Sequence, residues 1–225
     1  MKKIRAALFD LDGTLVDSLA DLAAAGNRVL TKLGKPVHEQ SAYRNFVGNG
    51  VRHLMRKALL PERDEALVEH AAQLMREDYA RSCNELSQAY PGMEQLMADL
   101  RAAGLKLAVV TNKPDEIAGS FVDGFFTPGT FDRVVGEIRG RPRKPDPAPA
   151  LAAAMELGVD PGQCVFVGDS DVDMKTGSGA GMPTVGVLWG YQDRERLESS
   201  SAGVIVSTAE EAKQVILEMA GHERS

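Results

Sequence analysis

The segment LFDLDGTLVDS (residues 8–18) places two aspartates, Asp10 and Asp12, at the end of an apolar run and follows them with Gly-Thr. Burying one unpaired carboxylate is costly, and a second carboxylate beside it raises the cost. Asp and Gly also form ordinary turns, so the segment alone is compatible with a polar junction or with a functional site. The sequence around it has to distinguish these two interpretations.

Residues 4–10 form the first of several short runs that are apolar and rich in β-branched residues. The others are residues 106–112, 131–136, 164–169, 184–189 and 203–207. Continuous apolar character without alternation predicts strands that are covered on both faces, as in a parallel sheet. Helical patterns separate most of these runs, at residues 93–104, 146–158, 174–181 and 208–220. The alternation predicts an α/β fold with a Rossmann-like, doubly wound parallel sheet.

A long interval between the first two predicted strands contains only helical patterns, at residues 19–34, 49–60 and 66–83. This interval is too long for a crossover between parallel strands, which needs about a dozen residues. We therefore expect an inserted α-helical cap domain at residues 17–90, with hinges near residues 16–17 and 89–92. The catalytic core would comprise residues 1–16 and 91–225.

The composition is that of an ordinary folded protein, with 44% hydrophobic and 26% charged residues among 225. The net charge of −6 gives no basic surface for nucleic acid or an anionic membrane, and no apolar run approaches the roughly 20 residues of a membrane helix. Carboxylates interrupt the N-terminal apolar segment, which argues against an export signal. Cys83 and Cys164 lack metal-ligand spacing and are too few for a disulfide framework. We expect a cytoplasmic protein with no nucleic-acid or membrane partner.

Polar residues follow three of the predicted strands at the same end. Asp10 and Asp12 follow the first, Thr111-Asn112-Lys113 the second, and Asp169-Ser170 the fourth. In open parallel sheets, ligands bind at the carboxyl ends of the strands, so we expect these side chains to converge on one crevice. Ordinary turn chemistry is a poor explanation for polar ends on three separate core strands.

The segment GDSDVD (residues 168–173) has alternating aspartates, which is typical of calcium loops. Met174 and Ala180 stand where such a loop needs Gly and Glu, so a calcium loop is excluded. Asp169 and Asp173 instead suggest a site for a hard metal ion, whereas Asp171 is expected to be a solvated turn residue. These aspartates would join the pair in the first motif.

Carboxylates gathered in one crevice need a counter-charge. Two unit charges about 4 Å apart cost around 4 kcal/mol at an effective dielectric of 20. Oxygen-only ligands select Mg²⁺ over zinc, so we predict a magnesium cofactor. Lys144, in RPRKPDPAPA (residues 141–150), is expected to pair with Asp10 and one phosphate oxygen, although a basic surface turn remains an alternative.

Four motifs stand in the order found in haloacid dehalogenase-like phosphatases: DLDGT, the strand ending in Thr111, Lys144 in RKPDP, and GDSDVD. The resemblance covers nearly the whole chain. The segments VGNGVRHLM, YPGM, TNKP and AGMPTVGVLWGY are similar to those of phosphoglycolate phosphatases. The resemblance implies a Rossmann-like core, a small helical cap, a Mg²⁺ requirement and hydrolysis of small phosphate monoesters.

Residue roles follow from the same resemblance. Asp10 would be the nucleophile that forms an aspartyl-phosphate, and Asp12 would act as general acid and then general base. Thr111 would bind the phosphoryl oxygens and Lys144 would stabilise their charge. The metal ligands would be the Asp10 carboxylate, the Asp12 backbone carbonyl and Asp169, with Asp173 as a direct or water-mediated partner. Val172 stands where many relatives carry Asn.

Substrate selection is expected to involve Asn112 and the cap loop YRNFVGNGVRH (residues 43–53), whose glycines allow close approach to a ligand. Gly48, Asn49 and Arg52 are the candidate binding residues there. Arg44, Asn49 and Arg52 would meet a substrate carboxylate, or they are solvated helix residues. Trp189 and Tyr191 are expected to pack rather than catalyse.

Several alternatives share the fold. A β-phosphoglucomutase-like phosphotransferase would return the phosphoryl group to a sugar, and a pyrophosphatase would cleave pyrophosphate. Asp12 argues against a dehalogenase, and no context singles out a cap lysine for a phosphonate hydrolase. A catalytically silent interaction module would have lost a motif residue. The expected partner is a small phosphorylated metabolite, and the protein is expected to be a monomer or a homodimer.

Overall fold

Six parallel strands form the central sheet of the computed structural model, which describes residues 2–200 and 202–222. Their order across the sheet is β5-β4-β1-β6-β7-β8. The bounds are β1 Ala6–Phe9, β4 Lys106–Pro114, β5 Arg133–Glu137, β6 Cys164–Gly168, β7 Thr184–Val187 and β8 Val204–Val206. Strand β1 is central, with Phe9 opposite Val109 of β4 and Val167 of β6. The predicted Rossmann-like parallel sheet is confirmed.

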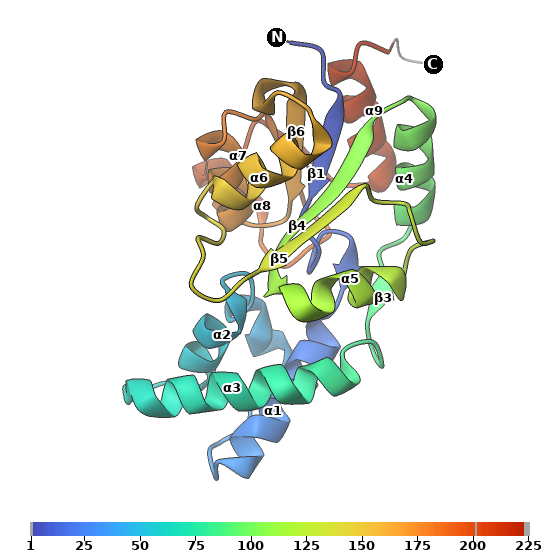
Figure 1. The fold of residues 1–225 in the computed structure, drawn as a ribbon. Helices are drawn as coiled ribbons and strands as arrows, with labels where there is room; N and C mark the ends of the chain where they lie inside the picture. The colour runs from blue at the N-terminus through green and yellow to red at the C-terminus, as the bar shows by residue number, and fades with distance from the viewer. Residues whose placement is uncertain (1, 201, 223–225) are drawn as a thin grey trace.

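Helices cover both faces of this sheet (Figure 1). Helices α4 (Met93–Ala102) and α9 (Ala209–Met219) lie on one side, while α6 (Ala148–Leu157), α7 (Asp171–Gly179) and α8 (Arg194–Ser199) lie on the other. Each face of the sheet has its own hydrophobic cluster. Alternate residues of β1 pack into one cluster or the other, because successive side chains on a strand point to opposite faces. Ala7 and Phe9 pack in the cluster that contains α4, whereas Ala6 and Leu8 pack in the cluster that contains α6.

The other part of the molecule is a helical insertion between β2 (Val16–Asp17) and β3 (Gln88–Ala89). These two short strands pair as an antiparallel ribbon. The insertion comprises α1 (Leu19–Lys32), η1 (Gln40–Asn45), α2 (Gly50–Ala58) and α3 (Glu65–Ser82). Figure 1 shows it beyond the end of the sheet at which β4 and β5 finish. The three predicted helices of this segment are present, and η1 is an additional short one.

The return from the helical insertion is fixed by a buried carboxylate of α1. Asp21 accepts hydrogen bonds from the Ser87 backbone N–H at 2.8 Å and from the Leu86 N–H at 3.1 Å. The Ser87 hydroxyl donates to the same carboxylate. Because buried donors without a partner are costly, this cluster ties the segment before β3 to α1.

Two elements differ from the sequence-based expectation. Helix α5 (Asp115–Asp123) occupies part of a segment that the sequence left without a helix. Its buried residues Ala118, Phe121 and Val122 recur at helical spacing, and Phe121 packs against Phe125 with ring centroids 5.0 Å apart, so a short apolar stripe supports this helix. Helix α7 begins at Asp171, three residues before the predicted start, because Ser170 and Asp173 form a capping box.

No helix within the described part of the chain has both the length and the apolar character that crossing a bilayer requires.

Candidate active site

Three strand ends meet at one edge of the sheet. Asp10 directly follows β1, Thr111 lies near the end of β4, and Asp169 directly follows β6. The Asp10 backbone N–H donates to the Val167 carbonyl at 2.9 Å, which keeps the first motif paired with β6. All three of these polar side chains are buried. Parallel strands that are hydrogen-bonded neighbours place their carboxyl ends together, and the structure accordingly brings these residues into one site.

Lys144 lies at the centre of the site and is almost completely buried. Its Nζ is 2.7 Å from Asp10 Oδ1 and 2.7 Å from Asp173 Oδ1. Burial lowers the pKa of this ammonium group, but the two carboxylates outweigh burial and raise the pKa above its ordinary value. Lys144 is therefore a permanent positive charge that holds the first and fourth motifs together.

Three buried carboxylates form a cluster around this lysine. Oxygens of Asp10, Asp169 and Asp173 all lie within 4.8 Å of one another. Burial, followed by the charge of Asp173, raises the pKa of Asp169 to about 7. The same two causes raise the pKa of Asp10 well above its ordinary value, although Lys144 opposes them. Additional positive charge at this site would favour the ionised forms of Asp10 and Asp169.

The site contains more carboxylates than ammonium groups. The carboxylates are those of Asp10, Asp12, Asp169 and Asp173, and the ammonium groups are those of Lys113 and Lys144. With every group ionised, two negative charges remain in excess, which one divalent cation would balance. Oxygen-only donors are those that Mg²⁺ prefers. The residues at this site therefore fit a magnesium ion.

Asp169 is held in place by groups from two other segments. Its Oδ1 accepts from the Thr14 hydroxyl at 3.2 Å, and its Oδ2 accepts from the Tyr191 backbone N–H at 2.7 Å. Trp189 supports the same region, because its indole N–H donates to the Thr14 carbonyl at 3.0 Å. The segment after β7 thus orients an acidic residue of the site. Trp189 and Tyr191 were expected to pack rather than catalyse, and these hydrogen bonds give them a further role in orienting Asp169.

Asp12 does not belong to the three-carboxylate cluster. Its Oδ1 accepts from the Ser18 hydroxyl at 2.5 Å and lies 3.0 Å from Lys113 Nζ. The side chain is thereby held at the boundary with the helical insertion. Asp171 also lies apart, half-buried at the start of α7, where it binds Lys175 and Gln192.

A small cavity of about 40 Å³ opens beside Asp10 and Asp12. One water molecule needs roughly 10–15 Å³ by the same kind of measure, so little space remains in this arrangement. Thr111, Asn112 and Lys113 line the core side. The helical insertion supplies the opposite wall, which consists mainly of Leu22, Val47, Gly48, Gly50, Val51, Leu54 and Tyr79.

Asn112 joins the two walls of this cavity. Its Nδ2 donates to the Gly48 carbonyl and to the Lys144 carbonyl, each at 2.9 Å. Its Oδ1 is buried and has no hydrogen-bond partner in the described structure. An orphaned acceptor beside a cavity is suited to a donor on a ligand or to a water molecule. The structure thus places Asn112 and Gly48 at the cavity, and their role in substrate binding stays a prediction.

Two other candidate binding residues of the helical insertion lie outside the cavity lining. Arg52 pairs with Glu65 at 2.6 Å and Glu69 at 3.1 Å, so packing of α2 on α3 turns it away from the site. Asn49 precedes α2 and is likewise not part of the lining. Arg44 donates instead to the Gly190 carbonyl at 3.4 Å. A carboxylate-binding cluster formed by these three residues is therefore not what the structure builds.

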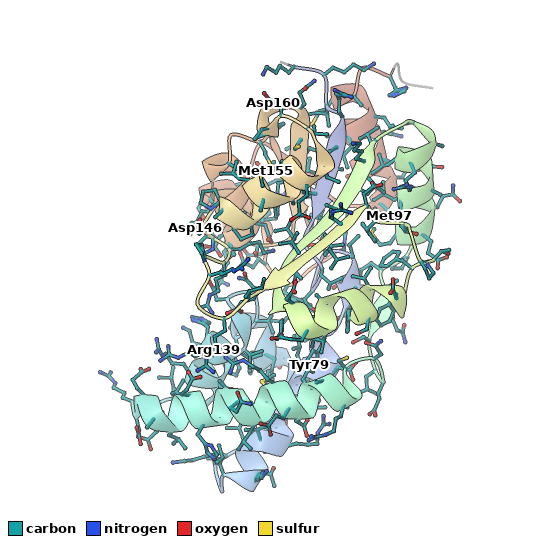
Figure 2. All side chains as sticks on the ribbon, viewed as in Figure 1. Tyr79, Met97, Arg139, Asp146, Met155 and Asp160 are labelled. Carbon is teal, nitrogen blue, oxygen red and sulfur yellow. The ribbon has the colours of Figure 1, made fainter. Side chains whose placement is uncertain are left out.

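Two cavity residues were not assigned a role from the sequence. Lys113 is buried although a lysine beside a proline is typical of a surface turn, and its only signal was its place at the end of a core strand. Tyr79 lies on the side of α3 that faces the sheet (Figure 2). It is buried, and burial raises the pKa of its hydroxyl well above the ordinary value, so the phenol stays neutral.

Comparisons with known proteins agree with this geometry. Residues 7–187 match the family described as haloacid dehalogenase-like hydrolase. Phosphoglycolate phosphatase from Pseudomonas putida is 38% identical over 207 residues, which cover 90% of this chain and 76% of that protein. Phosphoglycolate phosphatase from Aquifex aeolicus is 36% identical, with 84% of this chain and 86% of that protein covered.

A similar solved structure is that of a predicted phosphoglycolate phosphatase from Haemophilus somnus. It superposes with a TM-score of 0.85 at 29% identity and covers 96% of this chain and 99% of that one. Fold, motif positions and sequence similarity thus point to the same family over most of the chain. The protein is an enzyme of the haloacid dehalogenase-like hydrolase family, and within that family it is similar to phosphoglycolate phosphatases.

Proposed function

We propose that this enzyme is a magnesium-dependent phosphatase that hydrolyses small phosphate monoesters such as phosphoglycolate through an aspartyl-phosphate on Asp10. The observation that carries the proposal is the contact of 2.7 Å between Asp10 and Lys144 at the edge of an acidic cluster. The names of the relatives support the substrate class.

In the first step, an Asp10 carboxylate oxygen attacks phosphorus and the bond from phosphorus to the leaving alcohol oxygen breaks. Lys144 holds Asp10 through Oδ1 and places its charge where the phosphoryl oxygens gather. Thr111 Oγ1 accepts a hydrogen bond from the Lys113 backbone N–H at 3.1 Å. The Thr111 hydroxyl hydrogen is then left to donate to a phosphoryl oxygen.

Asp12 moves the protons of both steps. It gives a proton to the departing alcohol oxygen, and it then takes one from the water that attacks the aspartyl-phosphate. The second step breaks the bond between phosphorus and the Asp10 oxygen, releases inorganic phosphate and restores both carboxyl groups. Asp12 lines the cavity but stands apart from the acidic cluster, which suits a group that exchanges protons rather than holding a cation.

Magnesium would be held by the Asp10 carboxylate, the Asp12 backbone carbonyl and Asp169, with Asp173 as a direct or water-mediated partner. When bound, the ion supplies the positive charge that keeps these carboxyl groups ionised and offsets the charge of the phosphoryl group. Lys144 and Ser170 already bind Asp173, at 2.7 Å and 2.6 Å, which favours an indirect role for that residue.

The helical insertion would act as the cap of residues 17–90 over a core of residues 1–16 and 91–225. The β2–β3 ribbon is the covalent connection between the two, and the substrate cavity lies between them. The small cavity and its mainly apolar cap wall favour a substrate with few atoms beyond its phosphate group, and the present volume of about 40 Å³ would have to increase to admit it. Opening of the cap would admit the substrate, and closing would exclude water.

Release of inorganic phosphate from a panel of phosphate esters tests this function. With Mg²⁺, we expect 2-phosphoglycolate to be hydrolysed faster than hexose phosphates or pyrophosphate, and EDTA to abolish activity until Mg²⁺ is restored. Full activity in EDTA would exclude the metal. A preference for pyrophosphate would indicate a pyrophosphatase, and transfer of phosphate within a sugar phosphate without its release would indicate a phosphomutase.

A further inference from the structure

Lys113 is a buried ammonium group in the cavity that the mechanism above does not use. Its side chain is 1% exposed. Its Nζ lies 3.0 Å from Asp12 Oδ1 and donates to the Tyr79 hydroxyl oxygen at 2.8 Å. The same nitrogen lies 3.9 Å from the centre of the Phe121 ring. These contacts come from the first motif, from the helical insertion and from α5.

Burial of this ammonium group has a free-energy cost that core packing alone does not explain. A buried charge destabilises a protein unless it is paired and hydrogen-bonded, and an apolar residue would fill the same space at less cost. The Lys113 ammonium group contacts one carboxylate, one phenol oxygen and two aromatic faces, those of Phe121 and Tyr79. The neutral phenol can accept a hydrogen bond from the ammonium group, so each contact is favourable.

The contact with Asp12 fixes which of its oxygens is free for chemistry. Lys113 and Ser18 both bind Oδ1, so their two donors hold the carboxylate by one oxygen. Oδ2 is then the oxygen positioned to exchange a proton with the leaving group and with water. A carboxylate held in this way is restricted to few orientations. Less conformational freedom then has to be lost to reach the reactive geometry, which is the basis of catalysis by positioning.

We propose that Lys113 is a positioning residue that orients Asp12 for proton transfer, and that Tyr79 makes this positioning depend on the helical insertion being closed. The proposal rests on the proposed role of Asp12 as general acid. Tyr79 belongs to α3, so displacement of the helical insertion removes one acceptor and one aromatic face from the Lys113 ammonium group. Asp12 is thus correctly held only when the cavity is covered.

The leaving group separates a positioning role from a structural one. Glycolate leaves phosphoglycolate as an alkoxide and needs a proton, whereas acetate leaves acetyl phosphate as a stable anion and needs none. Rapid-quench measurement of the first turnover reports leaving-group release before water attacks the aspartyl-phosphate. With Mg²⁺ present, we expect Lys113→Met to slow release of glycolate at least about tenfold and release of acetate less than about threefold, because general acid catalysis contributes about 10²–10⁴-fold.

Conservative variants extend the test. Lys113→Arg keeps a positive charge and should retain more glycolate release than Lys113→Met. Tyr79→Phe keeps the ring but removes the acceptor, so it should show the same selectivity for the leaving group with a smaller loss. Tyr43→Phe is the matched control, because it also removes a buried hydroxyl of the helical insertion, which donates to Asn27 Oδ1 at 2.9 Å away from the cavity. It should leave both rates within about twofold of the wild type.

The variant Asp12→Asn, measured in the same experiment, tests the general-acid role of Asp12 separately from the positioning role of Lys113. Selective loss of glycolate release in both Asp12→Asn and Lys113→Met supports the proposal. Selective loss in Asp12→Asn with equal losses for both substrates in Lys113→Met would overturn the role of Lys113 alone. Equal losses for both substrates in Asp12→Asn would overturn the general-acid role of Asp12. Thermal unfolding of each variant identifies losses that come from misfolding, and Lys113→Arg then provides the decisive comparison.

Discussion

Gly190 packs against Asp169 so closely that position 190 has no room for a side chain. A Cβ there would lie 2.3 Å from the Asp169 Cβ and 2.4 Å from the Gly13 carbonyl oxygen. Both neighbours belong to the motifs that would hold the metal ion, and neither is the flexible end of a long side chain. The glycine thus allows the segment after β7 to close against the acidic cluster.

Gly190→Ala should therefore displace Asp169 and weaken the metal site. We expect the Mg²⁺ concentration for half-maximal activity to rise at least about tenfold, which corresponds to 1.4 kcal/mol. Gly119→Ala in α5 is the matched control, because nothing lies within 4 Å of its added Cβ. Titration of activity with Mg²⁺ for the two variants is the measurement. Equal Mg²⁺ requirements would contradict the assigned role of Asp169.

The metal-free protein should lose stability as the pH rises towards neutrality. The pKa of Asp169 is raised to about 7 from 3.8, first by burial and then by Asp173. Between these pH values the folded state binds more protons than the unfolded chain, so the free energy of unfolding falls as pH increases. Mg²⁺ binds the ionised carboxylates, and its stabilising effect should therefore grow over the same range.

Thermal unfolding from pH 5 to pH 8, in EDTA and in saturating Mg²⁺, measures this linkage. The increase in Tm caused by Mg²⁺ should be larger at pH 8 than at pH 5, and Asp169→Asn should reduce the difference. If Mg²⁺ raised Tm by the same amount at both pH values, ion binding would not be linked to deprotonation of the acidic cluster, which would contradict this prediction.

Arg52→Ala should have little effect on catalysis. Its partners Glu65 and Glu69 are on the surface of α3, where solvent screens the ion pairs, so these pairs contribute little to stability. We expect kcat and KM for phosphoglycolate to stay within about twofold of the wild type. Asn112→Ala is the informative comparison, since it removes the side-chain donor to the Gly48 carbonyl at the cavity and to the Lys144 carbonyl, and it should lower the free energy of unfolding by about 1–3 kcal/mol. A large rise in KM for Arg52→Ala alone would place the substrate carboxylate in the helical insertion.

The core part of the site was predictable because strand topology determines it. Apolar runs without alternation predict a parallel sheet, and residues that follow adjacent parallel strands, such as Asp10 and Asp169, necessarily meet at one edge. Lys144 was identified by its order among the motifs. Its second contact, with Asp173, depends on the capping box at Ser170, which the sequence-based start of α7 at residue 174 did not include.

The boundary between the sheet and the helical insertion was not predictable in the same way. Whether Arg52 points into the cavity depends on how α2 packs on α3, and its partners lie 13 and 17 residues away along the chain. The position of Lys113 at the end of a core strand predicts that it lies at the crevice, but its contacts with Tyr79 of α3 and Phe121 of α5 were not predictable. Contacts between helices that are distant in sequence decide both cases, and local patterns do not encode them.

The central claim is that Asp10 carries the phosphoryl group during turnover. Enzyme mixed with phosphoglycolate and Mg²⁺ can be quenched within one turnover and treated with borohydride, which reduces an acyl phosphate to an alcohol. Peptide mass spectrometry should then find homoserine at position 10, with Asp12 unchanged, and no homoserine in Asp10→Asn, which should also be inactive. Release of inorganic phosphate at the wild-type rate by Asp10→Asn, or homoserine at a position other than 10, would contradict this mechanism.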